Sequence, residues 1–456
     1  MSAFDRTSPP PSGSIRDFDF PKVDRRRLSN GLDLRVARVA RLPVVSVRLF
    51  MRSGESALGV DSAGLCVLTA NSLDGGTQKR SGTELAESLE RIGARFGANG
   101  GWEGTSASLY CLADRLAEAL PLLAEAVVEP GFPDDEVARA KDQHLAGLRQ
   151  QKMDPGSLAH DAALARYFAE GVPYARPDDG TEQTIAGVTA DHLRGYADAN
   201  YRPENGGLIV VGDVDTAEVV ELAERCFSGW TGSPASVADF EVTPAARERR
   251  VLVVHRPGAV QSEVRVGHVG THRLTPDYFA LSVANMVLGG TFTSRLNLNL
   301  RERNGFTYGV RSRFGFRSQP GPFEVATAVG NEVTPAAVRE ILNELEGIAS
   351  RGPTEDEVAS ARDFAAGIFG LQLETVGQIA SRASQLVVFG LAEDYYHEYR
   401  NRMRAVTTEG AAEAAGRHMR PNEAQVVVVG DADVVGPPLE ALGLGPFEVT
   451  REQPGA

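Results

Sequence analysis

Cysteine is scarce in this chain of 456 residues, and that scarcity limits the chemistry open to it. The three cysteines, Cys66, Cys111 and Cys226, are widely spaced, odd in number and never arranged as C-x-x-C. This argues against a disulfide framework or a cysteine-based zinc site and favours a reducing, cytoplasmic compartment. We interpret all three as small buried apolar side chains, and a thiol catalyst stays open at this level.

Positive charge is also in short supply. There are 47 Lys and Arg residues against 61 Asp and Glu, which gives a formal net charge of −14. This balance argues against nucleic acid or an anionic membrane as the main partner. Apolar runs of about eighteen residues are absent, so no bilayer-spanning segment is expected. Residues 1–19 lack the apolar stretch of a signal peptide and are predicted to be a disordered arm.

The chain contains an internal repeat with a period too long for a solenoid. Three pairs of similar segments recur in the same order, at offsets between 214 and 221 residues. A repeat of this length indicates a duplicated domain. The pairs are Y-R-P-E-N-G-G-L-I-V-V-G-D-V-D (201–215) with M-R-P-N-E-A-Q-V-V-V-V-G-D-A-D (419–433), D-E-V-A-R-A-K-D (135–142) with D-E-V-A-S-A-R-D (356–363), and G-G-T (75–77) with G-G-T (289–291).

Each half is predicted to be α+β. Strand-like segments at 32–39 and 44–54 precede several helices in the first half, and segments at 250–257 and 262–270 do so in the second. There is no regular β-α-β alternation, which favours a mostly antiparallel sheet with helices packed on one face.

Four regions follow from this organisation. After the arm, the N-terminal domain is expected at 20–226 and the homologous C-terminal domain at 249–450. The segment 227–248 is rich in Gly, Ser, Pro and Ala without a sustained period, and we interpret it as the linker.

Two threonines are expected to begin helices in the second half. Thr354 opens T-E-D-E, in which the side chains of Thr354 and Glu357 are predicted to form a capping box. Thr275 precedes Pro276 and an apolar run that ends at Gly289, which predicts Thr275 as the N-cap of that helix.

The segment S-A-G-L-C-V-L-T-A-N-S-L-D-G-G-T, residues 62–77, looks like a short helix that carries almost no reactive groups. Val67, Ala70 and Asn71 share one helix face at the i, i+3, i+4 spacing. With Gly-Leu before them and Gly-Thr after them, these residues resemble the first helix of the pitrilysin, insulinase and mitochondrial processing peptidase family. In active members that helix carries H-x-x-E-H, whose two His bind Zn²⁺ while the Glu polarises the attacking water.

The resemblance implies that this zinc site is degenerate. Val67 stands at the first His, Ala70 at the Glu and Asn71 at the second His. The family's third ligand is a Glu on a downstream helix, and the matching helix here has Gly147 near that position and Ala140 near a supporting Glu. We therefore expect this chain to bind no metal of its own.

No replacement site is expected elsewhere. His268 and His272 form H-x-x-x-H, and His255 lies a strand earlier, but their segment is predicted to be a strand end and loop, where this spacing does not converge on a metal. His144, on the downstream helix, is interpreted as part of a solvated face. Phosphate-binding glycine loops and a G-x-S-x-G nucleophile elbow are absent.

The second half keeps another signature of the same family. Residues 289–314, G-G-T-F-T-S-R-L-N-L-N-L-R-E-R-N-G-F-T-Y-G-V-R-S-R-F, resemble G-G-x-x-S-R-L followed by L-R-E-x-x-G-x-x-Y. In the family, the Arg and Tyr matched by Arg301 and Tyr308 hydrogen-bond backbone carbonyls of the bound peptide. A guanidinium and a phenol are suited to this because both donate. The alternative is structural, with Arg301 paired to Glu302 and Tyr308 as a half-buried core ring.

One further position departs from the family. Its first-half edge strand often reads N-A-x-T near the cleft, whereas residues 97–100 here read G-A-N-G. A peptide strand docked on the first half is therefore expected to be held differently, if it docks there.

The resemblance implies a non-catalytic, substrate-binding subunit of a heterodimeric zinc peptidase. Two bilobed chains would close like clam shells around unfolded peptides. A homologous partner with H-x-x-E-H would supply Zn²⁺, while this chain binds no cofactor and contributes Arg301 and Tyr308. Two alternatives remain, a structural or binding subunit of a larger complex without a proteolytic role, and a self-sufficient enzyme with other ligands.

Overall fold

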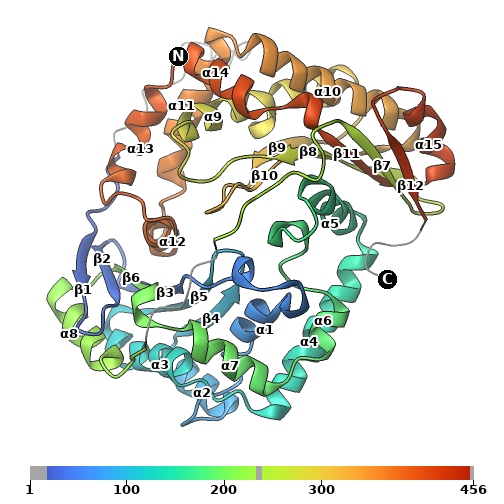
Figure 1. Ribbon diagram of the computed structural model, residues 1–456. Coiled ribbons are helices and arrows are strands. Elements are labelled where there is room, and N and C mark those ends of the chain that lie inside the picture. The colour runs from blue at the N-terminus through green and yellow to red at the C-terminus, as the bar shows by residue number, and fades with distance from the viewer. Residues whose placement is uncertain (1–17, 233–238, 452–456) are drawn as a thin grey trace, which may run out of the picture.

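The computed structural model describes residues 18–232 and 239–451, and each half of the chain forms one six-stranded sheet (Figure 1). In the first sheet, β2 and β6 are parallel and the other neighbours are antiparallel. The predicted α+β class is confirmed. The strand order is β1 (Asp24–Arg27), β2 (Asp33–Arg38), β6 (Gly206–Gly212), β3 (Val44–Met51), β5 (Thr105–Leu112) and β4 (Arg95–Gly100).

The second sheet repeats this order with corresponding strands. The pairs β11–β8, β8–β10 and β10–β9 are antiparallel, like the corresponding pairs of the first sheet. Strand β7 is parallel to both β11 and β12. Only the outermost strand differs in origin, since β1 precedes the sheet in sequence and β12 follows it. The order is β12 (Phe447–Thr450), β7 (Arg250–His255), β11 (Gln425–Gly430), β8 (Gln261–Val269), β10 (Pro322–Gly330) and β9 (Val310–Phe314).

Amphipathic helices of the same half cover the outer face of each sheet (Figure 1). Helix α10 shows why such helices pack on the sheet, because it has one apolar face. Buried apolar residues recur on that face at helical spacing: Val338, Ile341, Leu342 and Leu345. The main covering helices are α2 (Gly82–Arg91), α3 (Leu116–Val128) and α8 (Thr216–Phe227) in the first half, and α9 (Tyr278–Asn285), α10 (Thr334–Arg351), α14 (Thr408–His418) and α15 (Ala432–Glu440) in the second.

The inner face of each sheet is covered by a helix from the other half. Helix α5 (Pro155–Tyr167) packs on β8 and β11, and α12 (Val376–Val388) packs on β3 and β6. These two helices occupy equivalent places in the repeat, directly after α4 (Asp134–Met153) and α11 (Glu355–Leu371). The expectation of helices on one face was therefore incomplete. A central strand buried at every position, as β6 and β11 are, requires cover on both faces.

Helices α5 and α12, called the exchanged helices below because each packs on the sheet of the other half, form two apolar clusters that join the halves. Ile209 and Val211 of β6 pack with Ala383 and Val387 of α12 in one of them. A Cβ atom on Gly207 would lie 2.6 Å from Cγ1 of Val387, so the helix approaches the strand closely. The second cluster joins α5 to β7, β8 and β11. Sliding the two halves apart would expose both clusters to water.

The two predicted helix starts have different outcomes. The capping box of Thr354 and Glu357 is present, with both backbone amides bonded by the partner side chain. The prediction for Thr275 was wrong, because α9 begins at Tyr278 with Asp277 as its N-cap. Thr275 Oγ1 instead accepts from the amide of Asp277 in a turn before the helix.

The predicted arm and linker fall partly outside the described residues. Of the arm, residues 1–17 are not described, and Phe18 packs against the α12 cluster. The linker prediction spans the end of α8 to just before β7 and includes residues 233–238, which also lie outside the description. Within the described chain, no helix combines the length and apolar character needed to cross a membrane.

Candidate functional site

Helix α1 (Leu65–Asn71) presents no set of metal ligands. Val67 and Ala70 are buried, and Asn71 is exposed. The helix lies against edge strand β4, where a Cβ atom on Gly100 would come within 2.7 Å of the Val67 Cα. Buried apolar side chains thus occupy two of the three positions, Val67 and Ala70.

The downstream helix α4 contacts α1 but supplies no ligand either. Gly147 is half-buried, and a Cβ atom built there would meet no other atom within 4 Å. Ala140 packs at the margin of the first-half core. Since Val67, Ala70 and Gly147 have no donor atoms in their side chains, these residues do not fit a zinc ion.

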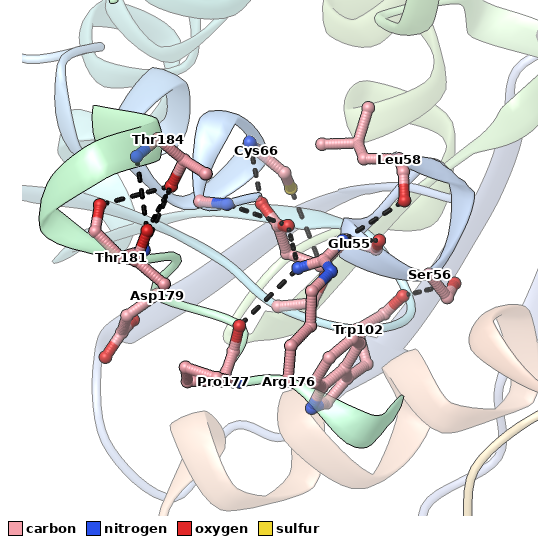
Figure 2. Close-up of polar contacts among 12 residues, drawn as sticks. Glu55, Ser56, Leu58, Cys66, Trp102, Arg176, Pro177, Asp179, Thr181 and Thr184 are labelled. Carbon is pink, nitrogen blue, oxygen red and sulfur yellow. Dashed lines mark hydrogen bonds and ion pairs between the residues drawn. The ribbon is translucent and has the colours of Figure 1, made fainter. Parts of the chain in front are cut away.

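Helix α1 is instead held at its N-terminal end by a buried carboxylate (Figure 2). Glu55 is 0% exposed, and its two oxygens accept from the backbone amides of Gly64, at 3.0 Å, and Cys66, at 2.9 Å. These amides belong to the first turn, where no partner exists within the helix. The first turn of the helix is therefore held by a side chain of its own domain.

Arg176 completes this cluster from a loop far along the chain (Figure 2). It donates from Nη1 to Glu55 Oε2 at 3.1 Å, and from Nη2 to the carbonyls of Glu55, at 3.0 Å, and Leu58, at 3.1 Å. Its guanidinium also lies 5.7 Å from the ring centre of Trp102. Burial raises the pKa of Glu55, while the two amides and Arg176 oppose that shift.

Arg301 is partly engaged in the structure. It lies in the π-helical segment Asn297–Arg303, with its side chain 31% exposed and its guanidinium 4.0 Å from the ring centre of Phe292. Nη1 is 3.4 Å from Glu302 Oε1, too loosely aligned for a hydrogen bond. The ion pair with Glu302, which the structural alternative predicted, is thus present but without a hydrogen bond.

Tyr308 is 98% exposed, so the alternative of a half-buried core ring is wrong. It lies on the loop that leads into edge strand β9. Asn297 anchors the β9 end of this loop to the G-G-T turn, because its side-chain amide donates to the carbonyls of Val310, at 2.8 Å, and Thr291, at 3.1 Å, and accepts from the Val310 amide. The phenol is thus projected outward from an anchored loop.

Tyr308 borders a cavity of about 670 Å³ that both halves of the chain build. Phe292, over which Arg301 lies, forms part of its wall, so Arg301 contacts a residue of the cavity without lining it. Helix α5, from the first half, contributes His160. Other lining residues come from the G-G-T turn and from β8, β9 and β10: Gly289, Gly290, Thr291, Arg265, Val310, Arg311, Ser312, Arg313, Glu324 and Ala326.

Two comparisons with known families bear on this arrangement. Residues 37–176 match the family described as Insulinase (Peptidase family M16), and residues 187–364 match the Peptidase M16 inactive domain. The chain belongs to the peptidase M16 family. Its two matched domains agree with the duplicated, clam-shell architecture that the resemblance implied.

Individual relatives of this M16 chain cover most of its length. An uncharacterised zinc protease of Mycobacterium bovis is 27% identical over 89% of this chain and 92% of its own. An uncharacterised zinc protease of Rickettsia bellii is 24% identical over 74% and 80%. A crystal structure described as a peptidase M16 inactive domain from Pseudomonas fluorescens is 27% identical, with a TM-score of 0.83, over 90% of this chain and 98% of that one.

Among the described residues of this M16 chain, neither His268 nor His272 belongs to a cluster of potential metal ligands. His268 is buried in β8, where Nδ1 lies 2.8 Å from the Val269 carbonyl and Nε2 accepts from the Arg420 amide at 3.0 Å. Both nitrogens are therefore used by the backbone. His144 is half-buried and bonds the Asp179 carbonyl, so its assignment to a solvated face was wrong.

Among the described residues, one group of three potential ligands lies close together. His255, Asp431 and Asp433 place ligand atoms within 4.8 Å of one another. Each of the three already has a bonding partner within the protein. His255 Nδ1 accepts from the Ala432 amide, and Asp431 accepts from the Gly258 amide. Asp433 forms an ion pair with Arg451. We interpret the group as the cap of α15.

The cysteines provide no nucleophile for this M16 chain. Cys66 and Cys111 are buried, and burial raises the pKa of each thiol to about 11. Cys226 is only half-buried, so the prediction that all three cysteines are buried was wrong for this one. Desolvation raises the pKa of its thiol as well.

Sequence reasoning missed the Glu55–Arg176 cluster and the contribution of His160. The two members of the pair are 121 residues apart, and no motif connects them. Similarly, nothing in the local sequence places α5 on the opposite sheet. The available signal was Glu55 itself, a charged residue set between strand β3 and the first helix.

Proposed function

We propose that this chain is the non-catalytic, substrate-binding subunit of a heterodimeric zinc peptidase. The observation that carries the proposal is a contrast within one molecule. On α1, Val67 and Ala70 have no ligand atoms in their side chains, whereas Tyr308 is almost fully exposed beside a cavity. A side chain without a bonding partner among the described residues is well placed to bind a molecule there.

The chemistry of the two residues supports a role in holding a peptide. The phenol of Tyr308 donates one directional hydrogen bond to a substrate carbonyl or to an oxyanion. Arg301 offers donors beside Phe292, whose ring stabilises the guanidinium. Bonds to backbone carbonyls accept peptides of varied sequence. Zn²⁺, its His ligands and the general base belong to a homologous partner with H-x-x-E-H.

The packing of the exchanged helices bears on how a peptide would reach the site. Because α5 and α12 tie the halves through two apolar clusters, opening within one chain would be costly. We therefore place the opening movement between the two subunits, with unfolded peptides entering the space they enclose. The three free cysteines favour the cytoplasm as the compartment.

Mixing the purified chain with a homologous chain that carries H-x-x-E-H tests the proposal. A quenched fluorescent peptide should be cleaved by the mixture far faster than by either chain alone, and the two should co-elute in gel filtration. If the pair co-elutes without any gain in cleavage, the structural-subunit alternative is correct. If this chain alone cleaves the peptide and binds stoichiometric zinc, the self-sufficient alternative is correct.

A further inference from the structure

We propose that the cavity beside Tyr308 is a subsite for a carboxylate of the bound peptide, with Arg311 as its main charge partner. The inference rests on the proposed substrate-binding role and adds a substrate class to it. The carboxylate belongs either to an acidic side chain or to the C-terminus of the peptide, and the experiment below separates these sources.

The charge of the cavity is opposite to that of the chain. The protein carries a formal net charge of −14, yet the cavity wall holds three arginines and a histidine against one carboxylate, Glu324. Walls of low dielectric concentrate such a local field toward the ligand. A cationic pocket in an acidic protein therefore indicates selection for a negative group.

Strand register brings the cations to one face of the sheet. Arg311 of β9 lies directly opposite Ala326 of β10, which in turn lies opposite Arg265 of β8. Directly opposed residues project to the same side of a sheet. Because the alanine between them is small, the two arginines flank a hollow instead of a filled surface.

Existing ion pairs leave Arg311 as the unbalanced charge. Arg265 is bonded to Glu263 at 2.9 Å, and Arg313 reaches Glu324 at 3.3 Å. In the part of the chain that the structure describes, Arg311 is exposed and has no ion-pair partner.

The one carboxylate in the wall does not compete for Arg311. Glu324 is buried, with Arg313 at one oxygen and His160 Nδ1 at 3.5 Å from the other. Burial raises the pKa of Glu324, but His160 and Arg313 lower it by more, so the net shift is downward. The carboxylate therefore stays ionised, and its charge is already balanced by these neighbours. The guanidinium of Arg311 is left with its planar fork of donors, which matches a carboxylate in bidentate geometry.

Fluorescence anisotropy with short labelled peptides tests the subsite without any partner subunit. The probes share one neutral sequence with a central Glu or Gln, each with a free or an amidated C-terminus. Arg311→Gln is compared with Arg339→Gln, an exposed arginine on α10 in the same half. Thermal unfolding checks that both variants are folded.

We expect the peptide with the preferred carboxylate to bind about five- to tenfold more tightly than its neutral counterpart, and Arg311→Gln to remove that difference. Arg339→Gln should retain it. A preference for Glu over Gln identifies a side-chain subsite, and a preference for the free acid identifies a C-terminal one. Equal binding of all four probes, or an unchanged preference in Arg311→Gln, would overturn the inference. The role of Tyr308 in the proposed pair is tested by a separate kinetic measurement, so failure of the subsite and failure of the proposed function can be told apart.

Discussion

Arg176 reaches across 121 residues to bond the carboxylate of Glu55 at 3.1 Å, directly beneath the first turn of α1. The carboxylate accepts from two backbone amides of this turn and from one guanidinium. The stability of this end of the helix therefore depends on an ion pair.

Removing Arg176 should destabilise the first half strongly. Arg176→Ala leaves the fully buried Glu55 without its charge partner, and breaking such a pair costs about 3–5 kcal/mol. Urea unfolding followed by circular dichroism measures the loss. Arg115→Ala, which breaks the exposed pair with Glu118, is the control and should have no measurable effect. Equal stability of the two variants would contradict a structural role for the pair.

Restoring the motif on α1 alone should not restore a metal site. Val67→His, Ala70→Glu and Asn71→His together provide two ligands and a base, but a catalytic zinc needs a third protein ligand. Adding Gly147→Glu supplies it at a position with open space. We expect stoichiometric zinc by atomic absorption only in the fourfold variant. Tightly bound zinc or peptidase activity in the triple variant would show that the site is more complete than described.

His268 should make the protein sensitive to acid. Burial lowers its pKa to about 3, since desolvation disfavours the charged imidazolium. Protonation of Nε2 would also break the bond from the Arg420 amide. The unfolded chain binds a proton near pH 6.5 and the folded chain does not, so stability falls as pH drops from about 6.5 toward 3.

At pH 5 this group alone should cost about 2 kcal/mol relative to pH 7. Unfolding titrations at both pH values measure the difference. His268→Gln should flatten it, whereas the exposed His397→Gln should leave it unchanged. An equally steep pH dependence in His268→Gln would refute the assignment.

The cysteines should differ in reactivity. Cys66 and Cys111 are buried with a thiol pKa of about 11, whereas Cys226 is half-buried. A thiol reagent at pH 8 should therefore label Cys226 first and the other two only after unfolding. Mass spectrometry of the native protein checks this, and rapid labelling of Cys66 would be incompatible with its position.

Much of the fold follows from local sequence. The repeated V-V-G-D segments correspond to β6 with its loop and to β11 with its loop, and the capping box at Thr354 begins α11 as predicted. These features depend on residues near one another in the chain. Thr275 shows the limit, since its pattern is a valid helix start but the chain forms a further turn before Tyr278.

The long-range features were beyond sequence reasoning. The side chains of α5 fit an ordinary buried helix, and only the three-dimensional arrangement shows that it packs on the opposite sheet and brings His160 to Tyr308. The exposure of Tyr308 likewise depends on Asn297 anchoring its loop. A motif identified both signature residues, but their surroundings had to come from the structure.

The central claim is that Tyr308 acts in the active site of the pair, and Tyr308→Phe tests it most directly. The substitution removes one hydroxyl donor and leaves the exposed ring, so folding and pairing should be unchanged. We measure kcat/KM of the reconstituted pair with the zinc content of the partner verified, and use Tyr110→Phe, an exposed tyrosine on β5, as the control. We predict a loss of about a hundred- to a thousandfold for Tyr308→Phe if the phenol bonds the oxyanion. A value within about twofold of wild type would contradict the account and leave this chain a structural subunit.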